Sequence, residues 1–402
     1  MKSLFKFIVI IVSICMLEAL FVSCDKMNDI HKKYLDEGER PYVGMPDSLT
    51  AFAGKGRVKL TWIANADPQL ETTVIYWNMR EDSIVKPFIR IKEGMQKDSV
   101  IIDGLSEDTH LFEIINKNSR NEHSMTATVQ GRSYGDNYEL RLFNRLVKRC
   151  MFDDNGSSLI IEWHDAGSTE VGVKLVFTDV DGNSRTMEIP STETVTTIPD
   201  FKLGEPVYCS TMHEPEPMMV DRLYAPAIAI PYTVNITKRM TNTEYPFRMG
   251  DFVNANNWEL VEWIVNEEAA INGCIDNYEG RALLSYVAWD DYPQSVMNNG
   301  KIYQTIELEA GSYRFDATHT GVWHYDWAAV YLTVALGTTL PDVENISTAL
   351  GSFPVTASGN TETLSVNFNV PQKSLVSLGF VMSGHNIQSL WNKVELWQFL
   401  DF

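Results

Sequence analysis

The chain has 402 residues and carries 53 acidic side chains against 33 Lys and Arg, a net charge of −20. This balance argues against nucleic acid and anionic lipid as partners, because affinity for polyphosphates comes mainly from Lys and Arg. Neutral ligands such as sugars are compatible with it. A chain of this length is expected to hold about two or three domains.

The first residues form a basic segment followed by an uncharged apolar run over residues 7–17. That run is too short for a membrane-spanning helix, which needs about 20 apolar residues. Ser23 lies directly before Cys24, and a lipoprotein signal peptidase requires a small residue before the cysteine that it exposes. We therefore predict that residues 1–23 are a signal peptide and that Cys24 is lipidated. An ordinary secretory signal is the alternative.

Residues 24–45 are mostly polar and are predicted to form a tether between the lipid and the folded part. A lipidated cysteine holds more than one acyl chain, so the anchor to the membrane should be stable. Residues 21–24 resemble a lipobox, with Phe21 where Leu is usual, and residues 25–29 resemble the surface-export signal of Bacteroidota-type lipoproteins. The resemblance implies an outer-membrane protein, lipid-anchored and exposed at the cell surface.

Three cysteines remain in the predicted mature chain after Cys24: Cys150, Cys209 and Cys274. An odd number of widely spaced cysteines does not indicate a disulfide framework. We predict buried free thiols. A Cys150–Cys209 bridge is the alternative.

Residues 46–134 read as the first of two β-sandwiches. Apolar and polar residues alternate over residues 57–62, as on a half-buried strand. Further strands are predicted over 73–77, 100–105, 110–115 and 124–130. The Leu60-Thr61-Trp62 strand and the corner of Gly104, Leu105 and Thr109 resemble a fibronectin type III domain. That family usually has Tyr where this chain has His110, which leaves the hydrogen bond of the corner open.

Residues 135–235 predict a second sandwich of the same kind. Residues 159–163 repeat the strand that ends in Trp, and Asp181-Gly182-Asn183 is a hairpin signal. Strands are also expected over 173–178, 185–189, 194–198 and 207–211. Short helices are predicted only over 138–148 and 261–271. The Thr- and Asn-containing stretch 233–244 is predicted to be a linker, after which residues 245–402 should fold alone.

In residues 245–402, strands are predicted over 282–289, 301–308, 311–317, 328–336, 362–370, 375–381 and 393–399. The stretches 299–308, 375–380 and 391–397 resemble galactose-binding-like jelly rolls, a class that includes many carbohydrate-binding modules. More closely, they resemble a C-terminal domain of unknown function in the same surface lipoproteins. The predicted fold class is therefore all-β, with two tandem immunoglobulin/fibronectin III-like sandwiches followed by a galactose-binding-like jelly roll.

Three connections of this third domain combine aromatic residues with Asp, Asn and His, and they cover residues 286–293, 319–327 and 383–391. Exposed aromatic faces beside convergent polar groups are the composition of a sugar site. The ligand-binding residues predicted there are Trp289, Asp290, Tyr292, Trp323, His324, Tyr325, Asp326, His385 and Asn386. Packing of the aromatic rings at the rim is the alternative. Tyr313, Phe315, Phe380 and Trp397 lie in alternating strands and are predicted to be core.

The sequence lacks the signatures of an enzyme. Neither a zinc-binding H-E-x-x-H nor a Gly-x-Ser-x-Gly elbow is present, and adjacent carboxylates such as Asp290 and Asp291 on a strand would face opposite ways. The jelly-roll resemblance implies that a structural calcium ion could be held, with Asp251, Asn254 and Glu395 as candidate ligands. The predicted function is non-catalytic glycan binding at the cell surface. The alternative is a structural or adhesin-like, protein-binding subunit of a surface complex.

Overall fold

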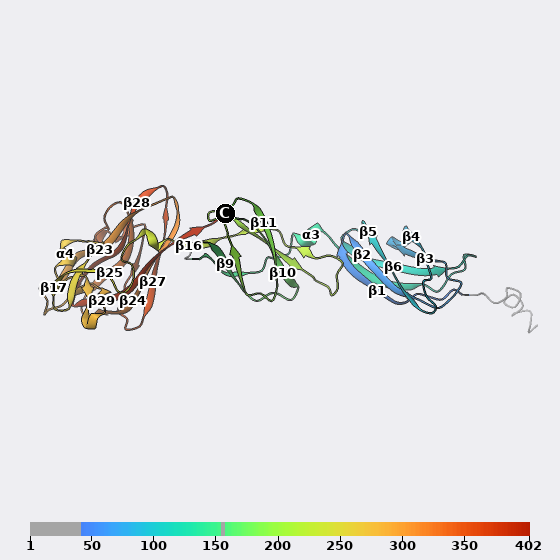
Figure 1. The fold of residues 1–402 in the computed structure, drawn as a ribbon, viewed down its shortest axis with the longest axis horizontal. Helices are drawn as coiled ribbons and strands as arrows, with labels where there is room; N and C mark the ends of the chain where they lie inside the picture. Colours follow the sequence, from blue (N-terminus) through green and yellow to red (C-terminus); the bar gives the residue numbers. More distant parts are fainter. Residues whose placement is uncertain (1–41, 154–156) are drawn as a thin grey trace, which may run out of the picture. The chain divides into compact units, whose positions relative to one another are not determined.

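The computed structural model describes residues 42–153 and 157–402, which are almost entirely β (Figure 1). The predicted signal peptide, Cys24 and most of the predicted tether lie outside the described residues. The chain divides into two compact units: one holds residues up to Tyr138 together with 214–223, and the other holds 139–213 and 224–402. No helix in the described part is long and apolar enough to cross a membrane.

The first unit is a seven-stranded sandwich. Its strands are β1 (Asp47–Lys55), β2 (Arg57–Ala64), β3 (Thr72–Trp77), β4 (Asp82–Pro87), β5 (Gln96–Asp103), β6 (Asp108–Lys117) and β7 (Ala127–Tyr134). The order is β4-β3-β6-β7-β1-β2-β5, and only the short β1–β7 contact is parallel. The alternation predicted for β2 is confirmed, since Val58, Leu60 and Trp62 are buried in its core. Strands β1 and β4 were not predicted.

The corner before β6 is closed by a histidine. Gly104 has a φ of 74°, a left-handed conformation that glycine adopts at little cost. The Nε2 atom of His110 then lies 3.0 Å from the carbonyl oxygen of Ser106. Because a carbonyl oxygen can only accept, Nε2 must carry the proton. His110 therefore forms the corner hydrogen bond that the sequence left open.

Residues 214–223, which the sequence assigned to the second sandwich, pack on the first unit. Asp221 accepts hydrogen bonds from Nε and Nη2 of Arg57 at 2.9 and 2.6 Å and from the backbone N–H of Lys55 at 2.9 Å. The hydrogen bond from Arg57 is the main reason that the pKa of Asp221 is lowered. Tyr134 donates to Glu216 at 2.8 Å.

The second unit begins with another sandwich. Its strands are β8 (Val147–Phe152), β9 (Ser158–Trp163), β10 (Glu170–Thr178), β11 (Ser184–Pro190), β12 (Val195–Pro199), β13 (Val207–His213), β14 (Leu223–Tyr224), β15 (Ile228–Ile230) and β16 (Tyr232–Asn235). The hairpin signal is confirmed, because Gly182 has a φ of 84° between β10 and β11. The helix predicted over 138–148 is wrong: α3 (Asp136–Glu139) is one turn, and β8 follows because Cys150 and Phe152 point into the core.

All three described cysteines are free and buried. Burial raises the pKa of each thiol to about 12. The prediction of buried free thiols is confirmed, and the alternative Cys150–Cys209 bridge is wrong.

The rest of the second unit is a larger sandwich, called here the C-terminal sandwich. Its main strands are β23 (Val296–Leu308), β24 (Gly311–His324), β25 (Ala328–Leu336), β26 (Gly351–Pro354), β27 (Glu362–Val370), β28 (Ser374–His385) and β29 (Ile387–Leu400). Shorter strands are β17 (Met249–Asn254), β18 (Asn257–Leu260), β19 (Ile264–Val265), β20 (Ile275–Asp276), β21 (Leu283–Leu284) and β22 (Val287–Ala288). Of the helix predicted over 261–271, only α4 (Glu267–Ala270) forms, capped by Asn266.

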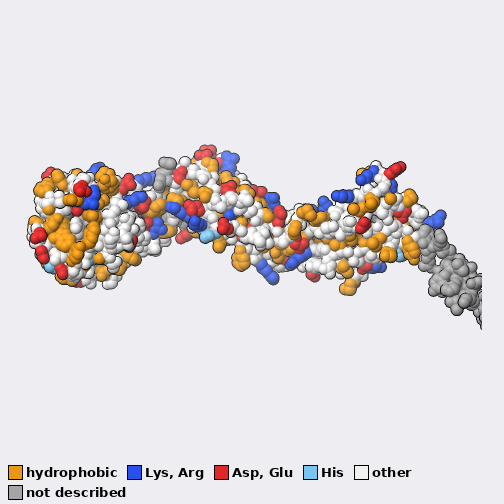
Figure 2. Space-filling view, turned by 90° about the horizontal axis from the view of Figure 1, so that it is seen from below, with side chains coloured by type: hydrophobic (Ala, Val, Ile, Leu, Met, Phe, Trp, Pro, Cys, Tyr) orange, Lys and Arg blue, Asp and Glu red, His pale blue; other side chains and the backbone are white. Residues whose placement is uncertain are grey.

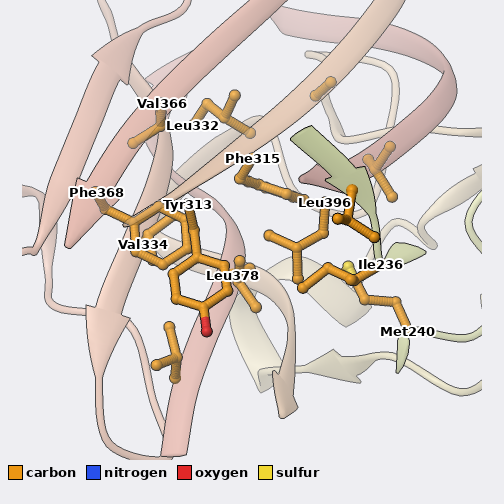
Figure 3. Close-up of a cluster of buried hydrophobic side chains, with 14 of the residues drawn as sticks. Ile236, Met240, Tyr313, Phe315, Leu332, Val334, Val366, Phe368, Leu378 and Leu396 are labelled. Carbon is orange, nitrogen blue, oxygen red and sulfur yellow. The ribbon is translucent and has the colours of Figure 1, made fainter. Parts of the chain in front are cut away.

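Two sheets build this sandwich. One has the order β27-β24-β29-β21-β20-β18-β17, with β22 also paired to β29, and is called the large sheet. The other has the order β19-β23-β28-β25-β26. Side chains from both sheets interleave between them: Figure 3 shows Tyr313 and Phe315 of β24 close to Leu332 and Val334 of β25. The core positions predicted at Tyr313, Phe315 and Phe380 are confirmed. Trp397 is buried as predicted, but its ring lies beside Arg314 on the outer face of the large sheet.

The linker predicted over residues 233–244 is wrong. Strand β16 pairs antiparallel with β29, with Asn235 opposite Trp397, and parallel with β8. The side chains of Tyr232, Val234, Ile236 and Met240 are buried in the core of the unit. Thr233 and Asn235, two of the residues that suggested a linker, are the alternate positions of β16 and point away from that core.

Candidate functional site

Three short connections meet at one end of the C-terminal sandwich. The first follows β22, and the second joins β24 to β25. The third consists of Asn386 alone and joins β28 to β29. Asn386 has a φ of 53°, a left-handed conformation that Asn tolerates better than most residues. Its carbonyl oxygen accepts from the N–H of Tyr325 at 3.1 Å, and its Oδ1 accepts from the N–H of Asp290 at 3.2 Å. One turn therefore fixes the other two connections.

A polar network reinforces this meeting point. The imidazole of His385 lies between two carboxylates, with Nε2 2.8 Å from Asp290 and Nδ1 3.0 Å from Asp326. Nδ2 of Asn386 donates to Asp326 at 2.7 Å and to Asp290 at 3.3 Å. Both ring nitrogens of His385 therefore lie within hydrogen-bond distance of a carboxylate oxygen, which can only accept.

Hydrogen bonds from His385 first, and from Asn386 second, lower the pKa of Asp290. They favour the ionised carboxylate. The ionised carboxylate thus stabilises the folded state fully above the pKa that Asp has in the unfolded chain. This stabilisation is lost as the pH falls through the lower pKa of the folded state. Asp290 is therefore ionised at neutral pH.

Aromatic rings lie beside this network. The ring centroids of Trp289 and Tyr325 are 5.2 Å apart at an interplanar angle of 46°. Tyr325 is 66% exposed and Trp327 is 52% exposed, so much of both rings faces solvent. We call Trp289, Tyr325 and Trp327, with the four polar residues of the network (Asp290, Asp326, His385 and Asn386), the apical platform. Figure 2 shows hydrophobic side chains gathered on the C-terminal sandwich, at the left, with Asp and Glu among them.

His324 does not belong to the platform. Its Nε2 lies 3.0 Å from the hydroxyl of Tyr286, which is fully buried. Desolvation lowers the pKa of His324 and raises that of Tyr286, so both are neutral. His324 faces the interior, opposite the buried Ile387 of β29.

The long loop predicted over residues 319–327 is wrong. Strand β24 continues to His324, so only three residues connect it to β25. Trp323 pairs with Gln388 of β29 and is half-buried on the outer face of the large sheet. Its ring covers Gly321, where an added Cβ would come within 2.4 Å of it. Trp323 is therefore neither a loop residue nor part of the core.

The remaining aromatic residues of the three connections differ in how far they are buried. Tyr292 is half-buried, and its N–H closes a turn onto the carbonyl oxygen of Trp289. Tyr286 and Trp391, which the sequence placed in aromatic connections, are fully buried. Conversely, Trp327 was not among the predicted ligand-binding residues, although it follows two of them directly. The sequence signal that could have indicated its exposure is its position in the connection just before β25.

The described residues contain no group of three or more His, Cys, Asp or Glu side chains that could hold a metal ion. The three calcium ligands guessed from the sequence do not meet. Asp251 and Asn254 lie on β17, whereas Glu395 lies on β29, and β18, β20 and β21 separate these strands in the sheet. Glu395 instead pairs with Lys393 at 2.8 Å.

Comparison with known proteins gives two family matches. Residues 24–223 match DUF4998, a domain of unknown function, and residues 241–379 match DUF5013, a second domain of unknown function. The chain matches no curated protein.

Among solved structures, the chain is similar to a two-domain fibronectin type III segment of chicken tenascin, with 11% identity, coverage of 46% of this chain and 98% of that chain, and a TM-score of 0.20. It is also similar to the FN1–FN3 domains of chicken CNTN1, with 11% identity, 47% and 67% coverage, and a TM-score of 0.27. The K3 adhesin domain of Lys-gingipain from Porphyromonas gingivalis matches with 14% identity, 41% and 98% coverage, and a TM-score of 0.25.

The prediction of an all-β chain with several sheets is confirmed. The fibronectin III-like identity of its first two sandwiches stays a prediction. A galactose-binding-like jelly roll in the C-terminal part stays a prediction, as do the ligand-binding roles of the platform residues.

Proposed function

We propose that this chain is a non-catalytic, cell-surface lipoprotein that binds glycans through the apical platform. The observation that supports it best is the exposure of Tyr325 and Trp327 directly beside a fixed set of carboxylate, imidazole and amide groups. Burying a large apolar side chain is favourable by roughly 1.5–3 kcal/mol of free energy relative to leaving it in water. A pyranose ring covers such a face with its C–H groups, and its hydroxyls bond to the neighbouring polar atoms.

The rigidity of the platform also supports binding. Side chains that are already held by hydrogen bonds lose little conformational entropy when a ligand arrives. Asp290 and Asp326 retain unused acceptor capacity, because a carboxylate offers about four lone-pair sites. Hydroxyl donors of a sugar can use these sites without breaking the contacts to His385.

A glycan array tests the proposal with the mature chain and the double variant Tyr325→Ala/Trp327→Ala. We expect the wild type to bind a defined set of glycans and the variant to lose about 1–3 kcal/mol of affinity, the range of central interface aromatics. Phe353→Ala is the matched control, because this ring is also exposed but lies on the other sheet, on β26. Binding of proteins but of no glycan would favour the alternative, an adhesin-like subunit of a surface complex.

Membrane anchoring depends on Cys24 in this proposal. Cys24→Ala should release the protein from the membrane or stop its export, because no other anchor is proposed. Metabolic labelling with a fatty-acid probe, followed by membrane fractionation, measures both lipid and location. If the unlabelled variant stayed in the outer membrane, the lipid-anchor proposal would be abandoned.

A further inference from the structure

A recess lies in the C-terminal sandwich, away from the apical platform. It has a volume of about 490 Å³ and is lined by two cations, one carboxylate and five uncharged side chains: Arg281, Lys393, Glu244, Tyr245, Leu283, Thr318, Thr320 and Asn392. This volume falls within the roughly 300–1,000 Å³ of small-molecule sites. The recess is distinct from the apical platform, with which it shares no residue.

The strand register places this recess on the outer face of the large sheet. Thr318 of β24 lies opposite Lys393 of β29, and the next pair, His319 and Trp391, faces the core. Trp323 lies on the same outer face, further along β24. From Thr318 to Tyr325 is about 20 Å along the strand. A glycan chain could therefore follow β24 from the platform past Trp323 to the recess.

The chemistry of the recess favours an acidic sugar. Tyr245 is 53% exposed and offers a ring face. The Arg281 guanidinium stacks 5.2 Å from the Tyr278 ring centroid and forms no ion pair with a carboxylate of the described chain. Its Nε–H donates to the carbonyl oxygen of Tyr278 at 3.1 Å, which leaves the two Nη groups to bind a carboxylate.

The recess offers hydrogen-bonding groups as well. Asn392 lines it, although its Oδ1 atom is buried from solvent. The hydroxyls of Thr318 and Thr320 add groups that can both donate and accept.

We propose that this recess binds a sugar residue carrying a carboxylate, a uronic acid, within the glycan that the platform binds. The proposal rests on the proposed function and adds to it the class of glycan: acidic, and several residues long. Arg281 would bind the carboxylate while Tyr245 stacks on the ring.

Calorimetric titration of the mature chain with trigalacturonate, and with its methyl ester, tests this inference. Arg281→Gln should weaken trigalacturonate binding about tenfold or more, since charge-assisted hydrogen bonds are involved, and should leave binding of the ester unchanged. Arg120→Gln, an exposed arginine of the first unit, is the charge-matched control and should change neither.

Equal binding of the acid and the ester, or equal effects of Arg281→Gln and Arg120→Gln, would overturn the recess proposal. The platform variant Tyr325→Ala/Trp327→Ala separates the two proposals, because it should weaken both ligands. If it weakened neither while Arg281→Gln selectively weakened the acid, the recess would stand and the platform proposal would fail.

Discussion

A fragment that starts at Tyr245 should fail to fold stably. It lacks β16 and the residues that follow it, and with them the buried side chains of Val234, Ile236 and Met240. Each contributes roughly 1.5–3 kcal/mol by burial, so the loss is about 4.5–9 kcal/mol. Whole domains are stable by only about 5–15 kcal/mol. Near-UV circular dichroism and urea unfolding measure the result.

A fragment starting at Pro231 is the control, because it keeps β16 and its pairing with β29. We expect it to unfold cooperatively and at higher urea concentration than the shorter fragment. Equal transition midpoints for both fragments would contradict the role given to β16 and would restore residues 233–244 as a linker.

Trp391→Ala should lower the free energy of unfolding by about 3–5 kcal/mol, the cost of truncating a buried aromatic residue. Trp391 is fully buried, its ring lies 4.6 Å from that of Phe380 and 5.2 Å from that of His319, and its indole N–H donates to Ser389 at 2.6 Å. Thermal unfolding of the mature chain measures the effect.

Trp327→Ala is the matched comparison, since it removes the same side chain from a position that is 52% exposed. Its effect on stability should stay within about 0.5–1 kcal/mol. Trp391→Phe should be milder than Trp391→Ala, because most of the volume remains. A melting temperature of Trp391→Ala equal to that of wild type would show that the core of the C-terminal sandwich is assigned wrongly.

These two tryptophans also show how far sequence alone could reach. Alternation identified most strands of the C-terminal sandwich, and the predicted strands 328–336 and 362–370 coincide with β25 and β27. Alternation does not show where a strand ends, however. Strands β24 and β29 both run closer to the turn at Asn386 than predicted, which turns Trp391 into a core residue and leaves Trp327 in a short connection.

The site itself depends on contacts that leave no local signal. His385 meets Asp290 and Asp326, which lie 95 and 59 positions earlier, only because β22, β24 and β28 end at one place. Composition could single out these residues, but it could not separate His324, which points inward, from its neighbour Tyr325. The pairing of β16 with β29, far along the chain, was hidden for the same reason.

The most direct test of the central claim is a calorimetric titration of the best-bound glycan from the array into the mature chain and into Tyr325→Ala/Trp327→Ala. The account predicts saturable binding by the wild type, an affinity lower by about 1–3 kcal/mol in the variant, and nearly equal melting temperatures for the two proteins. Unchanged affinity in a fully folded variant would contradict glycan binding at the apical platform.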